Sequence, residues 1–71
     1  MNLKEVAKRM DKKKQYKWEA NPFGEYHLIG ETGHRIYTTD EHLTAEIVSK
    51  KLRGMGFNIV GNVPAFKDLC D

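Results

Sequence analysis

The sequence is short of cysteine and of long apolar runs, and each shortage excludes a class of protein. Cys70 is the only cysteine in 71 residues, so an internal disulfide and a cysteine-based zinc site are both excluded. The sequence contains no run of 18 apolar residues, the length that could span a membrane. Its first residues are charged, unlike the apolar core of a signal peptide. We therefore expect a cytoplasmic protein without membrane segments that packing alone holds together.

The length predicts a single domain, residues 1–71. A domain of this size buries only about 60–65% of the surface that its unfolded chain exposes. Marginal stability is expected, and a deep enclosed pocket is not.

Charge is distributed unevenly along the chain, although the net charge is only +2. Up to Trp18 there are seven Lys or Arg residues and two acidic ones, whereas from Glu19 onward there are five basic and eight acidic residues. The sequence thus predicts a basic N-terminal edge on a mildly acidic body.

Two segments have the apolar spacing of amphipathic helices. In the first, residues 2–13, apolar side chains recur at Leu3, Val6, Ala7 and Met10, and Asn2 can cap the helix. The second follows Thr38–Glu41, where Thr38 is the expected cap, and its apolar positions are Ala45, Val48, Leu52 and Met55. Gly56 then has the position of a left-handed helix stop, with Phe57 as its hydrophobic partner.

Between the helices lie two similar turn sequences, Asn21-Pro22-Phe23-Gly24 and Gly30-Glu31-Thr32-Gly33. Both are typical of a type I turn with a bulged glycine, which predicts a three-stranded antiparallel meander. The implied rows are Trp18:Leu28:Ile36, Ala20:Tyr26:Thr38, Glu19:His27:Tyr37 and Lys17:Ile29:Arg35. In this register one face is apolar and the other is largely polar, so the predicted fold class is α+β.

The C-terminal part predicts a short strand over residues 57–60, which Gly61-Asn62 can turn back towards residues 63–66. Pro64 would confine the last segment to a sheet edge. Whether this segment joins the sheet is left open.

No motif indicates catalysis, a metal or a cofactor. The three histidines do not converge in the predicted register, and Asp68 and Asp71 beside Cys70 oppose formation of a thiolate. The stretch Gly30–Arg35 lacks the ending of a phosphate loop and leads into a strand, whereas phosphate loops lead into a helix. We therefore expect a protein that is not an enzyme.

The favoured hypothesis is a small protein-binding module, such as an adaptor, an inhibitor or a regulator. The outer sheet face would present a Tyr and an Arg among mixed charges, a composition found at interface anchors. The predicted partner-binding residues are Lys17, His27, Ile29, Arg35 and Tyr37. A second copy of the chain is a further candidate partner, because a marginal core favours dimer formation.

The alternative hypothesis is nucleic-acid binding. Three antiparallel strands followed by a helix resemble the sheet-reading DNA-binding domains of integrase arms, in which the free sheet face enters the major groove. The residues for this role would be Lys4, Lys8, Arg9, Lys12, Lys13, Lys14, Lys17 and Arg35. Glu19 in the middle of that face argues against it.

Two other resemblances rest on weaker observations. The element order is similar to that of double-stranded RNA-binding domains, but those carry a Lys cluster at the start of their second helix, where this chain has Asp40-Glu41-His42. We therefore reject that comparison. In small size and Lys-rich start the chain is similar to accessory proteins of phages and mobile elements, which suggests such an origin.

Overall fold

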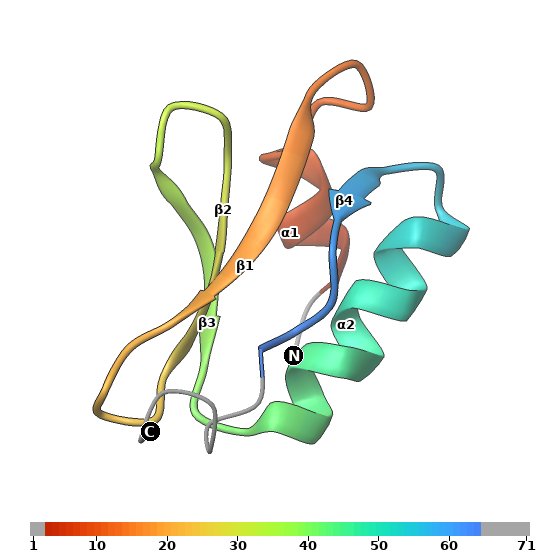
Figure 1. Ribbon diagram of the computed structural model, residues 1–71. Coiled ribbons are helices and arrows are strands. Elements are labelled where there is room, and N and C mark those ends of the chain that lie inside the picture. The colour runs from red at the N-terminus through yellow and green to blue at the C-terminus, as the bar shows by residue number, and fades with distance from the viewer. Residues whose placement is uncertain (1–2, 65–71) are drawn as a thin grey trace.

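The computed structural model describes residues 3–64 and confirms the α+β class. Two helices and four strands follow one another along the chain, and the strands form one sheet in the order β3-β2-β1-β4 (Figure 1). Their bounds, in chain order, are α1 Leu3–Lys8, β1 Gln15–Ala20, β2 Tyr26–Ile29, β3 Arg35–Thr39, α2 His42–Gly54 and β4 Asn58–Val60.

The first hairpin has the predicted register. β1 and β2 pair through Lys17:Ile29, Trp18:Leu28, Glu19:His27 and Ala20:Tyr26. In the connecting turn Gly24 has φ +85° and its N–H donates to the Asn21 carbonyl, as a type I turn with a bulged glycine requires. The Asn21 side chain also fixes this turn, because its Oδ1 accepts the N–H groups of Phe23 and Glu25, each at 3.0 Å.

The second hairpin has the predicted turn, but the predicted register is wrong beyond its first row. Gly33 has φ +85° and Ile29 pairs with Arg35 as expected, yet Leu28 pairs with Tyr37. Ile36 is the extra residue of a β-bulge, in which two residues of one strand oppose one residue of the next. As a result, Thr38 and not Tyr37 stands opposite His27.

The C-terminal strand joins the sheet, which the sequence left open. β4 lies parallel to β1, with the pairs Gln15:Asn58, Tyr16:Ile59 and Lys17:Val60. Parallel strands need a crossover connection, and α2 supplies it between β3 and β4. Residues 65 and 66 of the predicted return segment lie outside the described residues, while Val63 packs against the core.

α1 is shorter than the predicted helix 2–13. It ends at Lys8, and the N–H groups of Arg9 and Met10 donate three residues back in a tighter turn. The Asp11 carboxylate accepts the N–H of Lys13 at 2.8 Å, and a side chain that bonds its own backbone in this way competes with helix formation. The expected cap, Asn2, lies outside the described residues.

α2 ends as predicted but does not begin as predicted. Its N-cap is Glu41, without a side-chain capping bond, because Thr38 belongs to β3. At the other end the N–H of Phe57 donates to the Leu52 carbonyl and Gly56 has φ +98°, which is the geometry of a Schellman motif.

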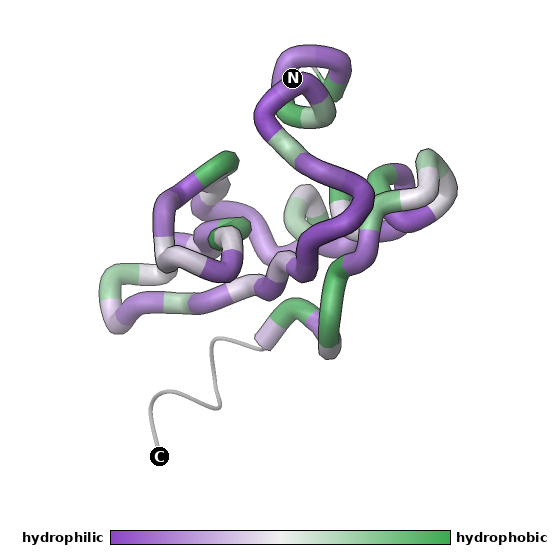
Figure 2. The backbone as a smooth tube through the Cα atoms, turned by 90° about the horizontal axis from the view of Figure 1, so that it is seen from above, coloured by the Kyte–Doolittle hydropathy of each residue, from purple (hydrophilic) through white to green (hydrophobic). Residues whose placement is uncertain are grey.

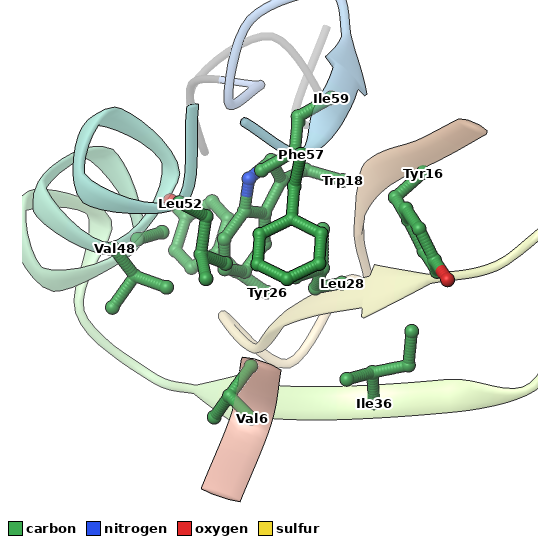
Figure 3. Packing of buried hydrophobic residues seen from close by; sticks show 11 residues of the cluster. Val6, Tyr16, Trp18, Tyr26, Leu28, Ile36, Val48, Leu52, Phe57 and Ile59 are labelled. Carbon is green, nitrogen blue, oxygen red and sulfur yellow. The ribbon is translucent and has the colours of Figure 1, made fainter. Parts of the chain in front are cut away.

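The core lies between the sheet and the two helices (Figure 3). The inward face of the sheet meets apolar side chains of both helices, and Leu28, Val48 and Leu52 are fully buried. The remaining buried members of the cluster are Val6, Tyr16, Trp18, Tyr26, Ile36, Ala45, Phe57 and Ile59. Between α1 and β1 the chain is hydrophilic apart from Met10, and this stretch contains the lysines at positions 12–14 (Figure 2).

The turn geometry predicts opposite effects of two alanine substitutions. Gly33→Ala should lower the free energy of unfolding by about 1–2 kcal/mol, because a left-handed conformation is unfavourable for a residue with a Cβ. A Cβ at position 33 would meet nothing within 4 Å, so any loss of stability in this variant comes from the backbone conformation and not from a steric clash. Gly54→Ala is the matched control, since it is helical and equally open, and should raise stability by about 0.5 kcal/mol.

Urea denaturation of the three proteins measures both effects. Equal stability of the Gly33→Ala variant and the unsubstituted chain would contradict the bulged-glycine turn.

Candidate interaction surface

The sheet face opposite the core carries one row of side chains that crosses all four strands. Paired positions place Val60 beside Lys17, Lys17 beside Ile29 and Ile29 beside Arg35. Lys17, Arg35 and Val60 are exposed, and Val60 retains 49% of its accessible surface. We call this set, Lys17, Ile29, Arg35 and Val60, the open-face row.

The structure places the five predicted partner-binding residues in three different environments. Lys17 and Arg35 are exposed, as the sequence predicts, whereas His27 and Ile29 are buried in the middle of the same face. Tyr37 was predicted on this face, and that placement is wrong. Because of the bulge, its ring lies edge-on to Trp18 at a centroid distance of 6.2 Å and packs against the core.

His27 is held by side chains on both sides of its ring. Its Nδ1 lies 2.9 Å from the Thr38 hydroxyl and its Nε2 lies 3.3 Å from Asn21 Nδ2. Because Asn21 Oδ1 already accepts two backbone N–H groups, the amide must present its NH₂ to the ring. Nε2 is therefore the acceptor and Nδ1 carries the proton. This bonding makes His27 a structural residue of the face, with no ring nitrogen left for a partner.

An apolar contact on the open face was missed by sequence reasoning. Val60 lines a shallow hollow of about 280 Å³, together with Gln15, Lys17, Gly30 and Glu31. These residues come from β1, β4 and the β2–β3 turn, and they meet only because β4 pairs with β1. No local pattern around Val60 predicts a parallel partner 43 positions earlier, because the pairing depends on the crossover through α2.

The charges of the open face are mixed. The Lys17 ammonium lies 3.8 Å from the Glu19 carboxylate, and both side chains are more than half exposed, at 61% and 57%. Such an exposed pair contributes little to stability. Arg35, at the opposite end of the row, pairs with Ile29 on β2.

The edge of the sheet at β4 is closed by an arginine. The Arg53 side chain on α2 donates from Nε and Nη2 to the Ile59 carbonyl, at 3.2 and 2.9 Å, and from Nη2 to the Gly61 carbonyl. Free carbonyl groups on an edge strand are a template for pairing with another chain. Arg53 occupies two of them, so a partner that binds here must approach the face and not the β4 edge.

The basic residues of the nucleic-acid hypothesis fall into two groups, because Lys17 and Arg35 belong to the open-face row and the other six lie on α1 and in the segment between α1 and β1. Lys8, Arg9 and Lys14 line a hollow together with residues of the β2–β3 turn. Figure 1 shows the turn after α1 and the β2–β3 turn at the same end of the molecule. Lys12 lies over the Phe57 ring, with its Nζ 5.6 Å from the ring centroid. Lys4 and Lys13 are exposed on α1 and on the following turn.

Within residues 3–64 there is no group of three or more His, Cys, Asp or Glu side chains that could hold a metal ion. The helices of this part of the chain are also too short and too polar to cross a membrane. Comparison with family models, with curated proteins and with solved structures found no match.

The role of Arg53 at the sheet edge predicts a change in both stability and association. Arg53→Gln removes the charged donor, and we expect the free energy of unfolding to fall by about 1–2 kcal/mol. Self-association should increase, because the β4 carbonyls become available. Urea denaturation and sedimentation at several concentrations measure the two effects.

Lys51→Gln is the matched control, because it removes one positive charge from the same helix turn without touching β4. Identical sedimentation and stability of the two variants would show that Arg53 does not protect the edge.

Proposed function

We propose that this chain is a non-enzymatic protein-binding module that uses the open-face row as its contact surface. The observation that carries the proposal is the row itself, in which exposed Val60, Lys17 and Arg35 stand on three strands of the sheet and buried Ile29 fills the position between Lys17 and Arg35. Apolar contacts flanked by charges are the arrangement found in protein interfaces, where the charges select and orient the partner.

The row supports a particular kind of partner. The hollow beside Val60 is shallow and open, so it suits one apolar side chain and not an enclosed small molecule. Lys17 and Arg35 stand at two separate positions of the row, and only Lys17 has a carboxylate close by. The expected partner surface presents an apolar side chain with a carboxylate near it. A regulator or inhibitor that acts in the cytoplasm fits this description, and a phage or mobile element remains the suggested origin.

Site-specific photo-crosslinking tests the proposal. A benzophenone amino acid at Val60, introduced into the chain expressed in its native host, should capture a partner protein. Leu43→benzophenone is the matched control, since Leu43 is an exposed apolar residue of α2, at 68% exposure. Excess unsubstituted chain should compete with capture, and Arg35→Glu should compete at least about tenfold more weakly because the row loses its charge complement.

Equal capture from both positions, or equal competition by Arg35→Glu, would contradict the proposal. A product of twice the chain mass would identify a second copy of the chain as the partner.

Nucleic-acid binding is the alternative, and the basic hollow next to α1 is the observation that favours it. A salt titration with random duplex DNA distinguishes the two functions. Affinity that is measurable at about 50 mM salt and falls steeply as salt rises would support the alternative, because each phosphate contact releases counterions. If no binding is detected at that salt concentration, the alternative is wrong.

A further inference from the structure

The turn that follows α1 and the β2–β3 hairpin enclose a hollow of about 180 Å³ at one end of the molecule. Its position is fixed by Tyr16, which is buried to 3% exposure and lines the floor. The Tyr16 hydroxyl accepts the N–H of Asp11, and this bond anchors the basic turn above the sheet. The hollow is therefore a built feature of the fold.

Positive charge dominates the rim. Lys8, Arg9 and Lys14 line the hollow, together with the carboxylates of Asp11 and Glu31. The Asp11 carboxylate is held in place by the backbone N–H of Lys13, at 2.8 Å. The three cations come from one short segment and outnumber the two carboxylates of the rim by one.

Uncharged donors complete the site. The Tyr16 oxygen accepts a hydrogen bond from Asp11, which leaves its own O–H proton to donate. On the other wall the Thr32 hydroxyl lies 2.7 Å from His34 Nδ1. When Nδ1 accepts that hydroxyl proton, Nε2 carries the ring proton and is a donor.

Glycine at position 30 allows the histidine ring to lie where it does. A Cβ at Gly30 would lie 2.6 Å from His34 Cε1, which is closer than real contacts permit. The His34 ring therefore lies against the Gly30 backbone. This contact fixes the position of the ring and of its donor nitrogen.

From this arrangement we propose that the hollow binds a phosphate group. Three cations against two carboxylates, together with the donors of Tyr16 and His34, match a ligand with several charged oxygens, whereas a carboxylate ligand would use only two of these donors. The phosphate belongs either to a small phosphorylated molecule or to the backbone of a nucleic acid. None of the four residues of the open-face row lines this hollow, although Tyr16 and Glu31 line both this hollow and the one beside Val60. The two proposals are therefore tested with different variants.

Titration with inorganic phosphate, followed by amide resonances at constant ionic strength, tests the site. Saturable shifts are expected for residues 9–14 and 30–34. Lys14→Gln should weaken binding about tenfold, as the loss of one charge-assisted bond predicts. Lys50→Gln is the matched control, because it removes an exposed lysine of α2 that does not line this hollow. The affinity of this variant for inorganic phosphate should equal that of the unsubstituted chain.

Shifts that rise linearly without saturation, or equal weakening by both substitutions, would overturn the proposal. The amide spectra also show whether each variant is folded. Arg9→Gln provides a second variant at the same rim if Lys14→Gln does not fold.

Two further titrations identify the source of the phosphate. Binding of a nucleoside monophosphate at least as tightly as a ten-residue oligonucleotide would assign the hollow to a small phosphorylated molecule. Much tighter binding of the oligonucleotide, with a steep salt dependence, would assign it to a nucleic-acid backbone. If neither competes with inorganic phosphate, the phosphate site is adventitious and the proposal is wrong.

Discussion

The packing of both helices against the same face of the sheet is the interaction on which the rest of the structure depends. Trp18 and Leu28 form the centre of that face, and Val48 and Leu52 cover them from α2. Each such side chain contributes about 1.5–3 kcal/mol when it leaves water. Residues 3–64 contain two helices, and because both cover one face of the sheet, the other face keeps exposed side chains. The surface available for recognition is thus a consequence of how the core is built.

The two ends of the molecule have different chemical character, because the strand directions bring different turns to each end. At one end the basic turn after α1 is held to the sheet by Tyr16, and positive charge gathers beside the β2–β3 hairpin. At the other end the β1–β2 turn exposes Phe23, at 86%, and His42 of α2 packs edge-on against Tyr26. The sequence contains both features, but their separation across the molecule is set by the strand directions.

The bulge at Ile36 changes which side chains the outer sheet face presents. It places Ile36 and Tyr37 together on the core side, where a regular strand would alternate them. Turn chemistry predicted the position of Gly33 and the first pair after it, because both depend on a few neighbouring dihedral angles. The extra residue depends on how well Tyr37 packs against Trp18, which is a contact between strands that are not neighbours. Alternation alone could not reveal it.

The sequence by itself determined the α+β class, both glycine-ended turns, the pairing of β1 with β2 and the Schellman end of α2. These features follow from side-chain period and from the φ angles that glycine permits, so they can be recognised within a few residues. Only the tertiary structure decided that β4 lies parallel to β1, that Arg53 closes the resulting edge and that Val60 stands in the open-face row. Each of these depends on the path of α2 across the core, where contacts join residues about forty positions apart and leave no local pattern in the chain.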